Sequence, residues 1–282
     1  MAVFSILEKK QFSPQVFYLK VHAPDIAKNR AAGQFVLVQL DDEYAERVPL
    51  TIADAHADEG WIALVIQTVG ATTMRLCEKE VGDSISVVLG PLGNPTLIEN
   101  VGTVACVAGG IGAAPLYPIA QAHKRAGNHV IVILGARNRD LIIFEEEMRA
   151  LADELVIVTD DGSYGRKGLV TEPLRELCER ASCPQEVVAI GPPIMMKFCA
   201  ETTRPFGIRT VVSLNTIMID GTGMCGGCRV NVGSEIKFVC VDGPEFDGHQ
   251  VDFESMMRRM RAFQAREAHD VHCCKMKHHA GR

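Results

Sequence analysis

The spacing of apolar residues along the chain changes near Asn100, and this change constrains the fold more than any other feature of the sequence. Before Asn100, short β-rich stretches are separated by glycines and Asp-containing turns, a pattern typical of a small antiparallel barrel. After it, apolar runs alternate with helical patterns, which predicts right-handed crossovers and a parallel sheet covered on both faces. We therefore expect a two-domain α+β protein with an N-terminal antiparallel β-barrel and then an α/β parallel-sheet domain. The expected strands include residues 16–21, 35–40 and 61–66 in the first part and 104–108, 129–134, 155–158, 186–190 and 210–214 in the second.

A third region begins after the last of these runs, where glycine and cysteine dominate residues 215–248. Such a composition predicts a small cap held together by a cofactor rather than by a large apolar core. We divide the chain into a barrel (1–98), a nucleotide-binding domain (99–214), a cap (215–250) and a C-terminal helix and tail (251–282).

The C-terminal segment carries an apolar stripe at helical spacing. We expect this stripe to pack against the core, and a helix that faces a partner protein is the alternative, because methionines are frequent at adaptable surfaces. The stripe consists of Phe253, Met256, Met257, Met260 and Phe263.

Composition and charge limit the classes of function. With 282 residues, 47% of them hydrophobic, the chain is long enough for two buried cores. The formal net charge of −6, without a basic run, argues against nucleic acid as a partner. The sequence shows neither an N-terminal targeting pattern nor an apolar run long enough to span a bilayer, so we expect a cytoplasmic protein with no membrane partner.

The strongest chemical signal is the run from Asp220 to Cys228, in which Cys225 and Cys228 are separated by two glycines. Together with Cys240 these cysteines supply three thiolates, and Asp220 in the same loop is the natural fourth ligand of a [2Fe–2S] cluster. Structural zinc, with His249 in place of Asp220, is the rival interpretation. A tight glycine turn with free thiols is the interpretation without a metal.

A second signal is the run Gly109-Gly110-Ile111-Gly112, which follows a buried strand and precedes a helical stretch. Glycines there allow a tight turn, so that a pyrophosphate can rest on the helix N-terminus. The run departs from the common dinucleotide fingerprint because Pro115 takes the last place. Residues 159–165 and 191–196 follow later strands, so we expect all three loops to line one cleft. The alternative is that they are ordinary connecting turns.

In the barrel half, residues 46–52 and 68–73 offer a cation, hydroxyls and backbone amides that could hold a flavin. The residue types alone do not single these segments out, because an arginine is more often a surface charge and threonines are ordinary β-sheet residues.

Taken together these motifs resemble the ferredoxin-NADP reductase superfamily, in which a flavin barrel precedes a nucleotide domain with Gly-Gly-x-Gly-x-x-Pro and Gly-Pro-x-x-Met. Within it, residues 46–54, 160–165, 190–197, 213–230 and 240–248 look very like the small subunits of NADH-dependent ferredoxin:NADP oxidoreductases, also called sulfide dehydrogenase subunit beta. The electron-transfer subunit of dihydroorotate dehydrogenase is a related family. Its cluster loop uses four cysteines, whereas Asp220 stands here where the first would fall.

The resemblance implies FAD, a [2Fe–2S] cluster and NAD(H) or NADP(H) as the cofactors and substrate. Two departures from the superfamily pattern stand out: Val48 and Leu50 hold the places of the flavin-binding Arg and aromatic residue, and Ile190 replaces a cysteine at the nicotinamide site. The implied flavin contacts are Arg47, Pro49, Leu50, Thr51, Gly70, Thr72 and Thr73, and the implied nucleotide contacts are Gly110, Gly112, Asp161 and Gly191.

The resemblance also implies an NAD(P)H-dependent oxidoreductase subunit in which a hydride from NADH reaches the flavin and single electrons leave through the cluster. The implied partner is a larger subunit with a second FAD and [4Fe–4S] clusters, which bifurcates electrons with NADPH and ferredoxin. No general base is required, so no catalytic acid–base residue is expected.

Other interpretations remain open at this point. They are a zinc-stabilised nucleotide-binding regulator and a self-contained oxygenase reductase. Arg137 and Arg139 either attract a 2′-phosphate or are surface charges. The Cys- and His-rich tail 272–279 has metal-binding residue types, but chain ends are usually mobile.

Overall fold

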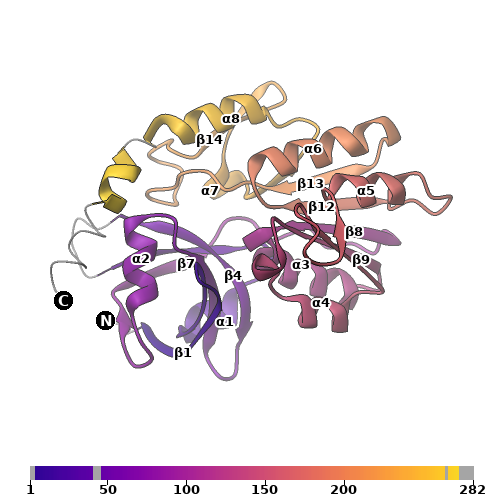
Figure 1. The fold of residues 1–282 in the computed structure, drawn as a ribbon. Helices are drawn as coiled ribbons and strands as arrows, with labels where there is room; N and C mark the ends of the chain where they lie inside the picture. Colours follow the sequence, from indigo (N-terminus) through magenta and orange to yellow (C-terminus); the bar gives the residue numbers. More distant parts are fainter. Residues whose placement is uncertain (1–3, 41–45, 264–265, 273–282) are drawn as a thin grey trace.

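A computed structural model of the protein describes residues 4–40, 46–263 and 266–272. An antiparallel barrel formed by the first part of the chain lies beside an α/β domain, and the C-terminal region covers one side of both (Figure 1). No helix in the described ranges is long and apolar enough to cross a membrane. The tail from 273 onward lies outside the described residues.

The barrel is built from the strands that precede residue 93, and its strand order among the described residues is β6-β1-β2-β5-β4-β3-β7. Because β6 and β7 follow each other in the chain but lie at opposite ends of this order, segment 84–92 closes the sheet on itself. Alternating apolar side chains point inward, and Leu19, Val36 and Leu64 are completely buried there. The strands are β1 (Phe4–Ser13), β2 (Val16–His22), β3 (Phe35–Gln39), β4 (Val48–His56), β5 (Trp61–Gln67), β6 (Ser84–Ile85) and β7 (Val87–Leu92).

Two helices accompany the barrel, α1 (Pro24–Asn29) and α2 (Ala71–Glu78). The first turn of α2 is held by Thr73, whose hydroxyl accepts hydrogen bonds from the backbone N–H of Val69 and Gly70 and donates to the carbonyl of Gly70. Leu76 anchors the other side of α2 in the barrel core.

The α/β domain has strand order β11-β10-β9-β8-β12-β13-β16 among the described residues, and all neighbours are parallel except β13 and β16. Successive residues of β8 point to opposite faces: Cys106 packs with α3 and α4, whereas Val107 packs with α5 and α6. The strands are β8 (Thr103–Gly109), β9 (His129–Ala136), β10 (Glu154–Thr159), β11 (Arg166–Lys167), β12 (Glu186–Ile190) and β13 (Arg209–Ser213), and the helices are α3 (Ala113–Arg125), α4 (Glu145–Leu151), α5 (Thr171–Cys178) and α6 (Pro193–Thr203), with 3₁₀ turns η1 (Gly110–Gly112), η2 (Arg139–Leu141) and η3 (Arg204–Phe206).

The C-terminal region is joined to the α/β domain by a strand and by apolar packing. Strand β16 pairs antiparallel with β13, and buried Cys228, Val230 and Cys240 belong to the same apolar cluster as Val107 and its neighbours. The apolar core of the cap is therefore continuous with that of the parallel sheet. The elements are β14 (Arg229–Val232), β15 (Glu235–Phe238), α7 (Val239–Asp242), β16 (Glu245–Asp247), α8 (Phe253–Met260) and η4 (Arg261–Phe263).

Helix α8 begins at an N-cap, Asp252, whose carboxylate accepts a hydrogen bond from the N–H of Ser255. Its apolar stripe packs inward: Phe253 and Met256 are buried in the shared core, and Met257 and Met260 are partly buried against it. The expected core packing therefore holds for the helix itself. Phe263, in η4 beyond the helix, is 54% exposed.

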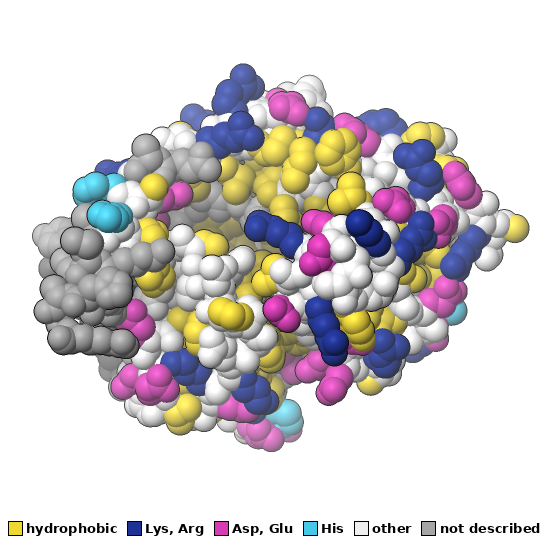
Figure 2. Space-filling view, viewed as in Figure 1, with side chains coloured by type: hydrophobic (Ala, Val, Ile, Leu, Met, Phe, Trp, Pro, Cys, Tyr) yellow, Lys and Arg dark blue, Asp and Glu magenta, His cyan; other side chains and the backbone are white. Residues whose placement is uncertain are grey.

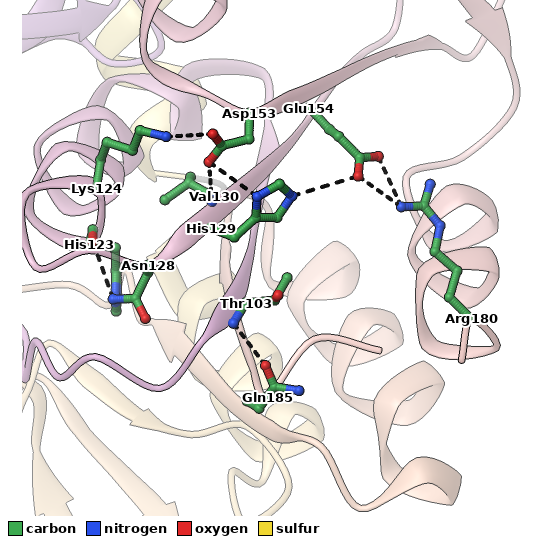
Figure 3. Close-up of polar contacts among 10 residues, drawn as sticks. All are labelled: Thr103, His123, Lys124, Asn128, His129, Val130, Asp153, Glu154, Arg180 and Gln185. Carbon is green, nitrogen blue, oxygen red and sulfur yellow. Dashed lines mark hydrogen bonds and ion pairs between the residues drawn. The ribbon is translucent and has the colours of Figure 1, made fainter. Parts of the chain in front are cut away.

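A polar network lies at the amino ends of the parallel strands (Figure 3). Asp153 accepts hydrogen bonds from Lys124 at 2.6 Å and from the N–H of Val130 at 2.8 Å, and Glu154 contacts Arg180 at 2.9 Å. Since ligands of such sheets bind at the carboxyl ends of the strands, this network stabilises the sheet away from the binding edge.

Candidate active site

A cleft of about 1030 Å³ lies between the barrel and the carboxyl ends of the parallel strands. This is the edge where open α/β sheets bind ligands, and the centre of the cleft coincides with the point where strand order reverses between β8 and β12. A cleft of this size is at the upper end of the usual range for ligand pockets, about 300–1,000 Å³. The predicted residues that line it are Pro49, Leu50, Thr51, Gly110, Gly112 and Gly191.

Close backbone packing explains the glycines on the nucleotide side. A Cβ on Gly112 would lie 2.2 Å from the carbonyl oxygen of Ile190, and one on Gly191 would lie 2.9 Å from the sulfur of Met195. The turns after β8 and β12 can therefore touch only without side chains. Gly110 has φ +55°, and a Cβ there would meet nothing within 4 Å, so its backbone faces open space at the N-terminus of α3.

The loop after β10 places two neighbouring aspartates differently. Asp160 lines the cleft, whereas the carboxylate of Asp161, the predicted contact, accepts a hydrogen bond from the N–H of Ser163 at 2.9 Å. Hydrogen bonds from Ser163 lower the pKa of Asp161. Of the two arginines after β9, Arg137 lines the cleft, and Arg139 stacks over a tyrosine ring at 5.0 Å.

The predicted flavin contacts at the barrel end are not all brought to the cleft wall. Arg47 donates from Nε to Gln39 at 3.1 Å, and Thr72 donates to Glu46 at 3.2 Å. Thr73 is occupied in capping α2, as described above. Arg47, Thr72, Thr73 and Gly70 therefore lie outside the cleft lining. The first N–H groups of α2 nevertheless have no acceptor within the helix, so this helix end remains suited to binding an anion.

One stretch of the cleft wall was given no role from the sequence: Ser213, Leu214, Asn215, Thr216 and Met218. Thr216 is only 8% exposed, and its hydroxyl oxygen has no hydrogen-bond partner among the described residues. A buried polar atom without a partner fits a wall that a polar ligand completes. Residues 213–230 carry part of the family resemblance, but the unpaired hydroxyl of Thr216 emerges only from the tertiary structure.

Residues 213–218 lead directly into the predicted ligand loop. The sulfurs of two predicted ligands, Cys228 and Cys240, already lie close together. The Sγ atoms of Cys228 and Cys240 are 3.3 Å apart, close to the roughly 3.8 Å between two sulfurs bound tetrahedrally to one metal. The N–H of Cys240 also points at the sulfur of Cys228 at 3.5 Å. Burial, together with contact with Cys228, raises the pKa of the Cys240 thiol to about 12, so metal binding there must release a proton.

The other two predicted ligands, Asp220 and Cys225, form the exposed side of the loop. The carboxylate of Asp220 accepts from the N–H of Thr222 at 2.8 Å and of Cys225 at 2.7 Å, and these bonds lower its pKa. Within the described part of the chain, no three His, Cys, Asp or Glu side chains are grouped so that they could hold a metal ion. Cys228 and Cys240 thus form a close pair of sulfurs, whereas Asp220 and Cys225 are joined through the backbone N–H of Cys225, which donates to the carboxylate.

Glycine conformation shapes the loop and seats it on the barrel. Gly221, Gly223 and Gly226 have φ between +64° and +82°, a region that side chains rarely adopt. A Cβ on Gly221 would lie 2.9 Å from both Leu37 and Leu92 of the barrel. The ligand loop is therefore in close contact with the barrel.

The zinc interpretation gains no support from His249. Its Nε2 atom is 2.9 Å from the hydroxyl of Thr203 and its carbonyl accepts from Arg204, so the imidazole joins the segment after β16 to the end of α6.

Comparisons with known proteins agree with this geometry. Residues 106–201 match the oxidoreductase NAD-binding domain, and residues 215–252 match the iron-sulfur cluster binding domain of dihydroorotate dehydrogenase B. A dihydroorotate dehydrogenase B (NAD(+)) electron transfer subunit homolog of Thermotoga maritima is 47% identical, covering 94% of this chain and 93% of the relative. The electron transfer subunit of dihydroorotate dehydrogenase B from Desulforamulus reducens is 34% identical, covering 88% and 97%.

A solved structure of the NADH-dependent reduced ferredoxin-NADP oxidoreductase, an enzyme described in terms of flavin-based electron bifurcation, superposes with a TM-score of 0.91. It is 45% identical and the match covers 96% of this chain and 98% of that one. The expected fold class, the FAD, [2Fe–2S] and NAD(H) cofactors and the assignment as an oxidoreductase are thereby confirmed. The chain belongs to the family of dihydroorotate dehydrogenase B electron transfer subunits and their homologues, and is an NAD(P)H-dependent oxidoreductase subunit for electron transfer.

Proposed function

We propose that this chain is the small subunit of an NADH-dependent ferredoxin:NADP oxidoreductase. In this proposal residues 1–98 bind FAD, residues 99–214 bind NAD(H), and residues 215–250 bind a [2Fe–2S] cluster. The observation that carries it is continuity along the chain: residues from Ser213 to Met218, all but Ile217, line the cleft, and Asp220 begins the ligand loop two residues later. A cofactor in the cleft and a cluster in the cap would thus be neighbours.

The flavin would lie against Pro49, Leu50 and Thr51, with its phosphates near the start of α2 at Gly70. Arg47, Thr72 and Thr73 shape that end of the site through the hydrogen bonds described above. The unpaired hydroxyl of Thr216 supports a polar cofactor in the cleft. When bound, FAD would supply the chemistry that converts hydride transfer from NADH into single-electron transfer.

The nucleotide would approach the open backbone at Gly110, beside the closely packed turns at Gly112 and Gly191, where N–H groups at the start of α3 would face its phosphates. Asp161 would then contribute indirectly, because its hydrogen bond with Ser163 fixes the conformation of the loop. Asp160, the neighbouring residue, would line the nucleotide site at the cleft wall.

The cluster would be held by Asp220, Cys225, Cys228 and Cys240. A close pair of sulfurs, with no third potential ligand grouped around it among the described residues, supports two irons that share four protein ligands better than one zinc ion with four.

The test is anaerobic purification of the full chain, with flavin, iron and acid-labile sulfide quantified beside the absorption spectrum. We expect a yellow-brown protein with iron and sulfide in the ratio of a [2Fe–2S] cluster. Cys240→Ser should lose iron, whereas Cys183→Ser, a half-exposed cysteine outside the loop, should retain it. A colourless protein that contains zinc would refute the proposal and favour the zinc-stabilised regulator.

The larger partner, with a second FAD and [4Fe–4S] clusters and access to ferredoxin, is part of the same proposal. The relatives are electron transfer subunits, which supports a partner subunit. The second candidate function, electron transfer to a dihydroorotate dehydrogenase, is favoured by the 34% identical relative named above. Isolation of the native complex and identification of its large chain separates the two, and also tests the oxygenase-reductase interpretation. A cytoplasmic location stays a prediction from the sequence.

A further inference from the structure

Two arginines from separate elements bind consecutive carbonyls in the turn between Cys225 and Cys228. Arg229, the first residue of β14, donates from Nη1 to the carbonyl of Gly226 at 3.1 Å. Arg259, on α8, donates from Nη2 to the carbonyl of Gly227, also at 3.1 Å. The two glycines between the cysteines are thus held by guanidinium groups from both sides of the cap.

The first of these bonds acts on the peptide unit that also contacts a sulfur. The carbonyl of Gly226 and the N–H of Gly227 belong to one peptide plane, and that N–H donates to the Sγ atom of Cys225 at 3.4 Å. By fixing the carbonyl, Arg229 fixes the direction of the N–H. A cation on the carbonyl also polarises the peptide, which strengthens the hydrogen bond at its other end.

Neither guanidinium is neutralised by a salt bridge among the described residues. The carboxylate of Asp220, on the same loop, is occupied by backbone N–H groups. Two guanidinium groups, neither of them paired with a carboxylate among the described residues, therefore stand beside the ligand turn. Along the upper part of the face in Figure 2, where Figure 1 places α8, basic side chains border an apolar area.

The long reach of Arg259 is supported by the anchoring of its helix. Phe253 and Met256 are buried beneath α8, and Glu254 accepts a hydrogen bond from Lys197 of α6 at 2.6 Å. The N–H of Asp252 also donates to the carbonyl of Asn231 in β14 at 2.9 Å. The helix that carries Arg259 is consequently fixed relative to the strand that starts with Arg229.

We propose that Arg229 and Arg259 are positioning residues that hold the Cys225–Cys228 turn and raise the reduction potential of the iron–sulfur centre. This inference rests on the proposed function. A centre that gains an electron becomes more negative, so cations and N–H donors at its sulfurs stabilise the reduced state. The pair of arginines thus opposes the effect of a hard, anionic carboxylate ligand, which favours the oxidised state.

The test is redox-poised EPR of anaerobically purified Arg229→Gln, Arg259→Gln and the double variant, with iron content measured on the same samples. We expect each single variant to shift the midpoint potential downward and the double variant to shift it further. Arg259→Lys keeps the charge and should shift it less than Arg259→Gln. The control is Arg258→Gln, an exposed neighbour on α8, which should leave the potential unchanged.

The charge contribution should also shrink with salt, because about 0.1 M salt screens exposed charges over about 10 Å. A purely structural role of the arginines would not show this dependence. Loss of iron from Arg259→Gln but not from Arg259→Lys, with circular dichroism unchanged, supports the holding role. Variants that keep their iron and show an unchanged or raised potential overturn the inference. Absence of iron from the wild-type chain is a different result, because it refutes the proposed function itself.

Discussion

Replacing Gly112 by alanine tests whether the nucleotide turn depends on backbone contact. The new Cβ would lie 2.2 Å from the carbonyl oxygen of Ile190, whereas real Cβ atoms essentially never come closer than 3.0 Å. The turn must therefore move away from β12 by roughly 0.8 Å, and the start of α3 moves with it. Gly112 has φ −59°, so an alanine there is free of backbone strain and the effect is purely one of contact.

We expect two consequences of this displacement. Overpacking costs about 1–3 kcal/mol of unfolding free energy, which lowers the melting temperature by several degrees. The displaced turn should lose about one backbone hydrogen bond to the charged phosphates, worth about 1.5–3 kcal/mol, so NADH affinity should fall by roughly 10- to 150-fold.

The assay is calorimetric titration of the flavin-loaded protein with NADH, together with thermal unfolding. The matched control is Gly207→Ala, outside the cleft lining, which adds a Cβ into open space at φ +64°; it should cost only about 1–2 kcal/mol of left-handed strain and leave NADH affinity unchanged. If Gly112→Ala binds NADH within about threefold of wild type and melts at the same temperature, the contact argument is wrong.

Three further predictions concern the ligand loop and the buried polar groups. Asp220→Cys should keep a cluster but shift its midpoint potential in redox-poised EPR, because thiolate is a softer ligand than carboxylate; an unchanged potential would show that Asp220 is not a ligand. Burial raises the pKa of Glu245 to about 7 from 4.5, so between these pH values the folded protein keeps this proton while the unfolded chain loses it. The free energy of unfolding should therefore fall by up to about 3 kcal/mol as pH rises from 4.5 to 7. In urea titrations, Glu245→Gln should reduce this dependence on pH. Asn128, shown in Figure 3, accepts hydrogen bonds from the N–H groups of Val101 and Gly102, and Asn128→Ala removes this acceptor. The free energy of unfolding measured in urea should fall by about 1–3 kcal/mol. The control Asn29→Ala, at an exposed position, should lower it far less.

Local patterns predicted the main elements because their causes are local. The buried runs at residues 104–108 and 186–190 became β8 and β12, since continuous apolar strands belong in a sheet covered on both faces. Glycine spacing likewise pointed to the turn after β8, where Gly112 does approach Ile190 closely. The cysteine spacing predicted a ligand loop, and the iron–sulfur domain match over residues 215–252 agrees.

Features that depend on distant parts of the chain were not predictable in this way. The closing strand segment at 84–92 and the three-residue β16 are too short to show a periodic pattern. The hydrogen bond between Arg259 and Gly227 joins residues 32 positions apart, and only the packing of α8 brings them together. The choice of Asp160 over Asp161 at the cleft depends on one side-chain bond to Ser163, which spacing cannot specify.

The pairing of β16 with β13 has a consequence for how this chain could be divided. The N–H of Leu214 bonds to the carbonyl of Pro244, and β13 is flanked by β12 on one side and β16 on the other. A fragment that stops after Ser213 would leave the outer edge of β13 without its partner strand, and an exposed strand edge is a template for aggregation. The iron–sulfur region therefore cannot be removed without exposing this edge, because it supplies β16, the last strand of the sheet. Shortened versions of the chain should retain at least the residues through Asp247.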